Sequence, residues 1–372
     1  SCPCSCNVLT FDMDDLPPQK SHRTTGRAAG LNPDVRFDRF HKEAVDDGWD
    51  LPEDLPVLRT EVRDEMARSV IARNTSPDLS FDRSINPYRG CEHGCIYCFA
   101  RPSHAFLGLS PGLDFETKLV AKPNAASQLE KELSNPRYVP KMIAIGTNTD
   151  AYQPIEKKRE IMRDVFKVLS AFNHPVGIVT KGTLIERDAD LLGPMAQKGL
   201  ARVGVSLTTL DPNLSRVMEP RVPSPKARLR TIRTLTDAGI PVRVMVSPVV
   251  PALTDHELEA ILTAAKEAGA VAASSIVLRL PREVAPLFRD WLETHYPDRA
   301  ARVMGRVREL HGGADYDPNF GTRMVGQGAW ATLLRQRFKL AARKLGLDRS
   351  LPELRTDLFA KPPQAGDQLT FL

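Results

Sequence analysis

The stretch SINPYRGCEHGCIYCFAR, residues 84–101, contains the residues on which most of the predicted chemistry depends. It places Cys91, Cys95 and Cys98 in a C-x3-C-x2-C spacing, with aromatic residues on both sides of the last cysteine. Iron–sulfur cubanes and structural zinc sites normally take four protein ligands. Three thiolates in one short loop therefore predict a metal centre with one position left open, where a substrate or cofactor can bind.

A zinc site is the alternative that the same loop leaves open. His93 lies between the first two cysteines, so the loop could supply three cysteines and one histidine. Its short spacing differs from the usual paired zinc knuckles, which makes zinc the minor alternative. A disulfide does not suit an odd local number of cysteines. Three further cysteines, Cys2, Cys4 and Cys6, are expected to belong to an irregular start or a disordered tail.

The cysteine spacing, with an aromatic residue just before the last cysteine, resembles the cluster loop of radical S-adenosylmethionine (SAM) enzymes. The longer phrase resembles the DNA repair photolyase branch, the relatives of spore photoproduct lyase. This resemblance implies that Cys91, Cys95 and Cys98 hold a 4Fe-4S cluster whose open iron binds SAM. It also implies an electron donor such as flavodoxin or ferredoxin, and reductive cleavage of SAM to a 5′-deoxyadenosyl radical that abstracts hydrogen from the substrate.

Downstream of the loop, segments of strand and helix character alternate. The strands are expected at 84–88, 142–146, 176–180, 201–207, 242–246 and 271–278, and the helices between them at 156–172, 188–198, 226–238 and 255–268. Thr254 is a candidate N-cap for the last of these helices. Such alternation predicts parallel strands joined by right-handed crossovers. Six strands are too few for a closed eight-stranded barrel. They match the partial (β/α)6 TIM-like barrel that the resemblance implies.

The regular pattern also divides the chain. We expect an N-terminal extension over 1–75, partly disordered and with a short hairpin at 57–75, and a radical SAM core over 76–282. A C-terminal helical extension over 283–372 follows, with helices at 284–294, 298–310 and 330–345.

Candidate site residues lie just after the strands, because the site of a parallel βα fold is at the carboxyl ends of its strands. The loop after the second strand resembles the family's loop for the SAM amino group and offers Gly146, Thr147, Asn148 and Asp150. The other candidates are Thr180 and Lys181 after the third strand, Ser206 after the fourth, and Arg221 in the loop beyond. Lys181 could pair with the SAM carboxylate or a substrate anion. Arg221 could clamp a carboxylate, or form a surface pair with Glu219.

The sequence indicates the type of reaction more clearly than it indicates the substrate. A net charge of +5 and a pI near 8.9 are compatible with a polyanionic partner without demanding one. No apolar run is long enough for a membrane span and no secretory signal is visible, so a cytoplasmic location is expected.

Spore photoproduct lyase uses a cysteine as a hydrogen-atom donor, but this chain has none outside the cluster loop and the first six residues. A lyase of that kind would need another donor, such as Tyr152. Three hypotheses stay open: a radical SAM enzyme acting on nucleic acid or a lesion in it, a radical SAM enzyme modifying a protein or small molecule, and a non-catalytic zinc module that binds nucleic acid.

Overall fold

The computed structural model describes residues 26–38 and 58–363, and its main sheet has seven strands. Their order is β10-β9-β8-β7-β6-β3-β2, with β2 Ile71–Arg73, β3 Arg83–Ile85, β6 Ile143–Ile145, β7 Val176–Thr180, β8 Ala201–Ser206, β9 Val242–Val249 and β10 Ala272–Val277. All neighbours from β3 to β10 are parallel, and β2 is antiparallel to β3. The six parallel strands confirm the predicted partial barrel.

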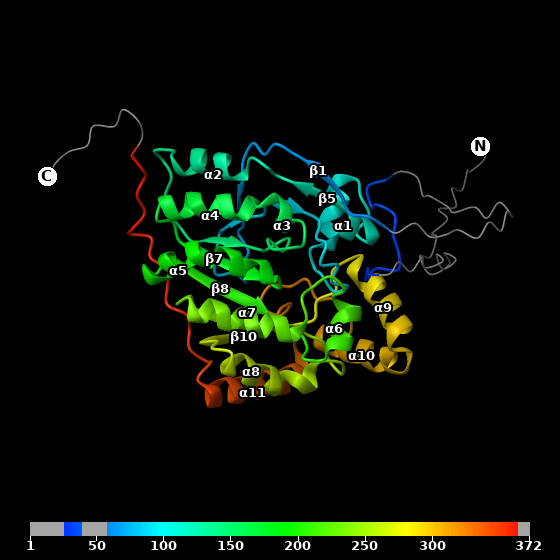
Figure 1. Cartoon of the computed structure of the whole chain (residues 1–372). Helices are drawn as coiled ribbons and strands as arrows, with labels where there is room; N and C mark the ends of the chain where they lie inside the picture. The colour runs from blue at the N-terminus through cyan, green and yellow to red at the C-terminus, as the bar shows by residue number, and fades with distance from the viewer. Residues whose placement is uncertain (1–25, 39–57, 364–372) are drawn as a thin grey trace, which may run out of the picture.

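Helices cover one side of this sheet (Figure 1). They are α3 Glu156–Arg159, α4 Ile161–Ala171, η2 Thr183–Asp188, α5 Ala189–Gln197, α7 Pro225–Asp237, η3 Asp255–Glu257 and α8 Leu258–Glu267. The short helix α6 Pro212–Met218 instead packs Leu214 and Met218 into a second buried cluster. The predicted helix over 156–172 is interrupted at Glu160, whose φ is 50°. Thr254 occupies the predicted N-cap position, at the start of η3, but its hydroxyl accepts the amide of Val250 at 2.9 Å and makes no capping bond to a helix amide.

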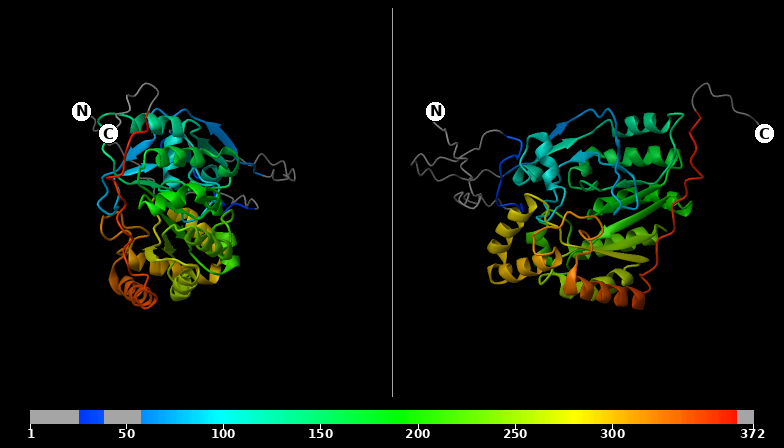
Figure 2. Two further views of the ribbon diagram at one scale, coloured as in Figure 1. Left: turned by 60° about the vertical axis from the view of Figure 1, so that its left-hand side comes forward. Right: turned by 180° about the vertical axis from the view of Figure 1, so that it is seen from behind.

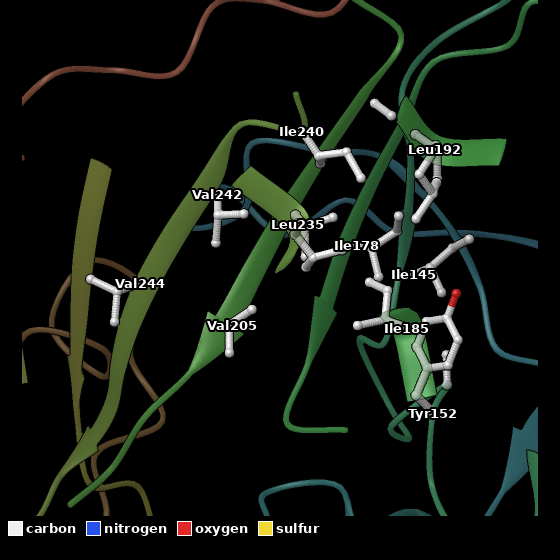
Figure 3. Packing of buried hydrophobic residues seen from close by; sticks show 14 of the residues in the cluster. Ile145, Tyr152, Ile178, Ile185, Leu192, Val205, Leu235, Ile240, Val242 and Val244 are labelled. Carbon is white, nitrogen blue, oxygen red and sulfur yellow. The ribbon is translucent and has the colours of Figure 1, made fainter. Parts of the chain in front are cut away.

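The core lies between the sheet and these helices (Figure 3). Alternate strand residues such as Ile178 and Val244 point into it and pack with helix residues such as Leu235. The other residues of the strands point to the inner face of the partial barrel. Gly204 is one of them, and a methyl group there would meet the sulfur of Met245 at 2.8 Å. The alternation thus separates a packed outer layer from the inner face.

A second, three-stranded sheet lies beside the first, in the order β1-β5-β4, with β1 Glu61–Asp64, β4 Tyr88–Arg89 and β5 Lys118–Ala121. The predicted hairpin over 57–75 is wrong, because β1 pairs with β5 whereas β2 pairs with β3 of the main sheet. The elements η1 Arg101–Leu107, α1 Leu113–Thr117 and α2 Ala125–Leu133 were not expected from the sequence.

The C-terminal region is helical as predicted, with α9 Val284–His295, α10 Pro297–Leu310 and α11 Gly328–Leu345. After α11 an extended segment runs past the amino ends of the strands, drawn in red in Figures 1 and 2. The Arg355 amide donates to the Gly199 carbonyl at 3.0 Å, and the Ala360 amide to the Phe172 carbonyl at 3.1 Å. The segment is thereby held against the loops that precede β7 and β8. The three expected regions and the two boundaries between them stay predictions.

Candidate cluster and cofactor site

The cysteine loop follows β4 and rests directly on α1. The amide of Cys91 donates to the carbonyl of Phe115 at 2.9 Å. Gly94 has a φ of 65°, and a methyl group on it would lie 2.7 Å from a carboxylate oxygen of Glu116. Both the left-handed conformation and the close approach require glycine here. The glycine of the C-x3-C spacing therefore lets the loop fold onto its support.

Below the loop lies a buried ion pair that sequence reasoning missed. The guanidinium of Arg101 donates to the carbonyls of Cys95 at 3.0 Å and Gly94 at 3.1 Å, and contacts Glu116 at 2.5 Å. Glu116 also accepts the amides of Ala28 and Ala29. Neither Arg101 nor Glu116 is exposed to solvent. The pair fixes the path of the loop through its carbonyls, and no local spacing in the sequence signals it.

The three thiols are free, two of them buried and Cys98 half-buried. Burial raises the pKa of Cys95 to about 12, although Lys181 opposes the shift. Burial also raises the pKa of Cys91, with Asp150 and then the other two thiols adding to the effect. The thiols are thus close enough to repel one another as thiolates. Metal ligation requires the thiolate form, so bound iron would supply the missing positive charge.

The donor set fits a cluster better than a single ion. Among the described residues, no three His, Cys, Asp or Glu side chains gather closely enough to hold one metal ion. A cubane instead gives each of the three thiolates its own iron. Nδ1 of His93, the fourth ligand of the zinc alternative, lies 3.3 Å from a carboxylate oxygen of Asp150, which leaves Nε2 as the nitrogen that could bind a metal. The spacing of the described donors, and not the contact of His93, disfavours a single zinc ion.

Asp150 is occupied by groups of the protein itself. Its two carboxylate oxygens accept the Thr180 hydroxyl at 2.6 Å and the amides of Lys181 and Tyr152 at 2.7 and 2.9 Å. Burial by itself would raise the pKa of Asp150, but His93 and these donors hold it well below the usual range. His93 adds an ion-pair contact at 3.3 Å to these three hydrogen bonds. Asp150 thereby ties the β6 loop to β7, and its expected contact with the cofactor stays a prediction.

Thr180 has the same internal role. Its hydroxyl donates to Asp150 and accepts the amide of Gly182 at 2.8 Å. A cofactor contact of Thr180 stays a prediction.

The first residues of the loop after β6 lie at the end of that strand, as the sequence predicts. Gly146 has a φ of 83°, and a methyl group there would lie 1.9 Å from the Val179 carbonyl oxygen. The Thr147 hydroxyl lies 3.3 Å from the Asn86 amide nitrogen, and the Asn148 amide donates to Asn86 at 3.0 Å. Gly146 is thus required by packing against β7. Cofactor contacts of Gly146, Thr147 and Asn148 stay predictions.

Tyr97 of the cysteine loop and Lys181 lie close to the buried carboxylate of Glu219. The hydroxyls of Tyr97 and Thr208 both donate to Glu219, which also pairs with Arg228 at 2.7 Å. Burial by itself would raise the pKa of Glu219, but Arg228 and then Lys181 outweigh it and lower that pKa.

The Lys181 ammonium lies 5.7 Å from the centre of the Tyr97 ring. Burial would lower its pKa, but Cys95, Glu219 and Asp150 together raise it. Lys181 is therefore a cation beside the cysteine loop.

Arg221 and Ser206 flank this group. The predicted pair between Glu219 and Arg221 is wrong, because Glu219 binds Arg228 and Arg221 lies 3.3 Å from Glu92 of the cysteine loop. The predicted carboxylate clamp by Arg221 thus has a partner within the protein. Ser206 is buried at the end of β8, where its carbonyl accepts from Arg228 at 3.1 Å.

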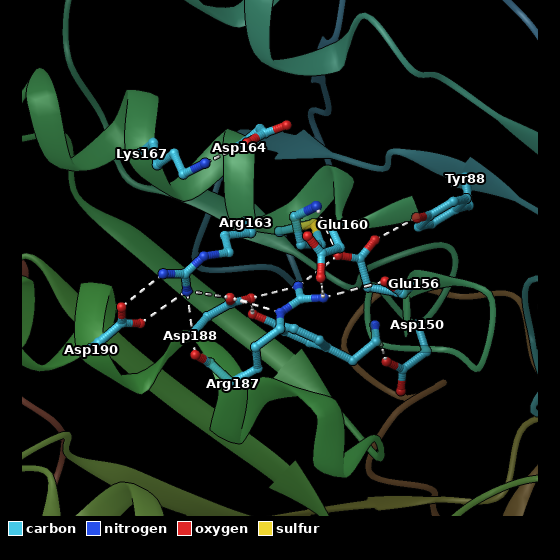
Figure 4. A network of polar contacts seen from close by, with 12 residues as sticks. Tyr88, Asp150, Glu156, Glu160, Arg163, Asp164, Lys167, Arg187, Asp188 and Asp190 are labelled. Carbon is cyan, nitrogen blue, oxygen red and sulfur yellow. Dashed lines mark hydrogen bonds and ion pairs between the residues drawn. The ribbon is translucent and has the colours of Figure 1, made fainter. Parts of the chain in front are cut away.

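Tyr152 does not face the site. Its hydroxyl donates to Asp188 at 2.9 Å, and its ring stacks on Phe166 in the helix-side core (Figure 3). Asp188 continues into a polar network with Arg187 and Arg163 (Figure 4). Only 1% of Tyr152 is exposed. The expected hydrogen-atom donor is therefore wrong, because the side chain turns into the layer between sheet and helices.

Comparison with known proteins agrees with this geometry. The model of the radical SAM superfamily matches residues 85–265. The uncharacterized proteins Rv2578c of Mycobacterium tuberculosis and Mb2609c of Mycobacterium bovis are each 40% identical over 242 residues, which cover 64% of this chain and 70% of theirs. The uncharacterized protein MJ0683 of Methanocaldococcus jannaschii is 29% identical over 173 residues, covering 46% and 62%.

Among solved structures, the fold is similar to that of spore photoproduct lyase in complex with a dinucleoside spore photoproduct. The TM-score is 0.54 at 16% sequence identity, over 76% of this chain and 79% of the lyase. This likeness confirms the partial TIM-like barrel.

The chain belongs to the radical SAM superfamily. Enzymes of this superfamily use a 4Fe-4S cluster and SAM as cofactors and need an electron donor, so these are the cofactors of this chain. No helix in the described part of the chain is long and apolar enough to cross a membrane.

Proposed function

We propose that Cys91, Cys95 and Cys98 hold the 4Fe-4S cluster and that the enzyme cleaves SAM reductively to begin hydrogen abstraction from nucleic acid, in a lyase-like reaction. One observation carries this proposal: three free thiols stand at the carboxyl ends of the parallel strands, beside the Lys181 cation. The cluster supplies the electron, and SAM supplies the group that takes the hydrogen atom.

The residues around the thiols have distinct tasks. Lys181 binds the SAM carboxylate, because its ammonium stays charged beside Cys95. Ser206, Gly146, Thr147 and Asn148 line the strand ends and contact the remaining polar groups of SAM. The buried pair of Arg101 and Glu116 binds the carbonyls of the loop and so fixes the positions of the thiols.

Nucleic acid is the favoured substrate class, on two grounds. The lyase with a similar fold was solved with a dinucleoside photoproduct, and the chain has a net charge of +5. The alternative is a radical SAM enzyme that modifies a protein or small molecule. The core spans 76–282, between extensions over 1–75 and 283–372. We place the enzyme in the cytoplasm, where flavodoxin or ferredoxin supplies the electron to an oxygen-sensitive cluster.

Anaerobic reconstitution with iron and sulfide tests the proposal. Addition of dithionite and SAM should release 5′-deoxyadenosine, and Cys95→Ala should abolish both the iron content and the product. Cys4→Ala, which removes a thiol outside the loop, is the matched control and should behave as the parent chain. Retained zinc with no product would instead support a structural metal and a binding role.

A further inference from the structure

Four phenylalanines are unusually exposed. Within residues 26–38 and 58–363, the exposed aromatic side chains are those of Phe37, Phe99, Phe106 and Phe320, with exposed fractions of 58%, 50%, 74% and 58%. Large aromatic side chains are normally placed in cores or interfaces, where they bury much apolar area. Their exposure calls for a binding partner.

Each of these rings has an arginine guanidinium beside it. Arg36 lies 4.9 Å from the Phe37 ring centre and 5.3 Å from that of Phe106. Two further pairs have the same geometry, with Arg279 at 4.9 Å from Phe99 and Arg323 at 4.5 Å from Phe320. A guanidinium next to an aromatic ring offers a stacking face and a positive charge side by side.

Two of the four rings belong to the cluster loop or to the helix that follows it, and two of the rings are in contact. Phe99 directly follows the cluster ligand Cys98, and Phe106 is in η1, which follows the loop. The rings of Phe37 and Phe106 are 5.4 Å apart. Arg36 joins this end to η1, because it donates to the carbonyl of Pro102 at 2.9 Å.

The remaining residues of this set, Arg279, Phe320 and Arg323, lie after β10 and in the C-terminal region. Arg279 follows β10, and its pKa is lowered chiefly by burial, with Arg323 close enough to lower it further. Arg323 is anchored to Asp78 at 2.6 Å. Three segments distant in sequence, 36–37, 99–106 and 320–323, thus present these rings, and Arg279 links the ring next to Cys98 to the last of these segments.

We infer that these side chains, the Phe–Arg rim (Phe37, Phe99, Phe106, Phe320, Arg36, Arg279 and Arg323), bind single-stranded nucleic acid by stacking unpaired bases. The inference deepens the proposed function and rests on it. Base stacking on aromatic rings tolerates any sequence, because every base has a π-face. Arg36 and Arg323 are paired with Glu283 and Asp78, at 2.9 and 2.6 Å, so they contribute cation–π contacts to the rings more than free charge for phosphates. Bases inside a duplex already stack on their neighbours, so the rim should favour single strands.

Fluorescence anisotropy of the anaerobic holoenzyme tests the rim. The probes are labelled oligothymidine and oligouridine of about 20 nucleotides, longer than common single-strand site sizes, and a duplex of equal length. Single strands should bind more tightly than the duplex. Phe106→Ala and Phe320→Ala should each weaken that binding by roughly five- to tenfold, as loss of one stacked base does. The salt dependence should keep its slope, since no phosphate contact is lost.

Leu340→Ala is the matched control, because Leu340 is 67% exposed and lies on α11, outside the rim. It should bind as the parent chain does. Equal affinity for duplex and single strand would overturn the inference, and so would phenylalanine variants that behave like the leucine control. Tighter binding of oligothymidine would indicate DNA and tighter binding of oligouridine would indicate RNA. Both results support the rim.

Release of 5′-deoxyadenosine without any oligonucleotide is measured in the same preparations. If the protein cleaves SAM but does not prefer single strands, only this inference is refuted. If it binds single strands through the rim without cleaving SAM, only the proposed reaction is refuted.

Discussion

The guanidinium of Arg101 contacts the Glu116 carboxylate at 2.5 Å directly beneath the cysteine loop, and water reaches neither side chain. A buried pair of this kind is costly to break, because the remaining partner keeps an uncompensated charge. The same guanidinium holds two carbonyls of the loop. Folding of the chain and placement of the thiols are therefore linked through one side chain.

Glu116→Gln should lower the free energy of unfolding by about 3–5 kcal/mol, since it leaves the Arg101 charge unpaired in a buried place. Urea denaturation under anaerobic conditions measures the loss. Arg355→Gln is the control, because it breaks the pair with Asp357 at the surface, where both side chains are exposed. That variant should change stability little. Equal stability of the two variants would contradict the proposed role of the buried pair.

Gly146→Ala should be severely destabilising, by more than about 3 kcal/mol, because the added methyl group would lie 1.9 Å from the Val179 carbonyl oxygen. Gly239→Ala is a matched comparison, since Gly239 has a φ of 77° but no atom within 4 Å of the added methyl. It should show only the left-handed strain of about 1–2 kcal/mol. Thermal and urea unfolding of both variants separate packing from strain, and similar losses would refute the packing argument.

Lys181→Ala should weaken SAM binding roughly ten- to hundredfold, the loss expected for one hydrogen bond to a charged group. Equilibrium dialysis of the reconstituted, unreduced enzyme measures it without turnover. Lys181→Arg should restore part of the affinity, because it keeps the charge. Lys339→Ala, which removes an exposed lysine of α11, serves as the control. Unchanged SAM affinity in Lys181→Ala would remove Lys181 from the cofactor site.

The stability of the protein should fall in mild acid, in part because of His174. Burial lowers the pKa of His174 to about 4, from 6.5 in the unfolded chain. The unfolded state therefore binds the proton first, so stability is full above pH 6.5 and is lost as the pH falls toward 4. Between pH 7 and pH 5 this group should cost about 2 kcal/mol.

Comparison with His174→Gln, by urea denaturation at both pH values, checks this contribution. The side chain of His174 lies 2.7 Å from the Tyr138 hydroxyl, on the amino-end side of the sheet and away from the thiols. The variant should lose less stability on acidification than the parent chain. An identical loss in both proteins would assign the pH dependence to other groups.

The sequence by itself determined the superfamily, the three candidate cluster ligands and the parallel βα alternation. These features are local, since ligand spacing and the alternation of strand and helix character are written in consecutive residues. The strands β7 at 176–180 and β8 at 201–206, for example, lie where the pattern predicts them. The candidate residues at strand ends followed from one general rule of topology.

Tertiary structure alone decided what those residues contact. The sequence could not tell that Asp150 and Thr180 would bind each other, or that Tyr152 would turn into the core. Nor could it pair Arg101 with Glu116, or place an arginine beside each of four exposed phenylalanines. Such contacts join residues far apart in the chain. Their energies depend on burial and on competing partners, which arise only when the layers pack together.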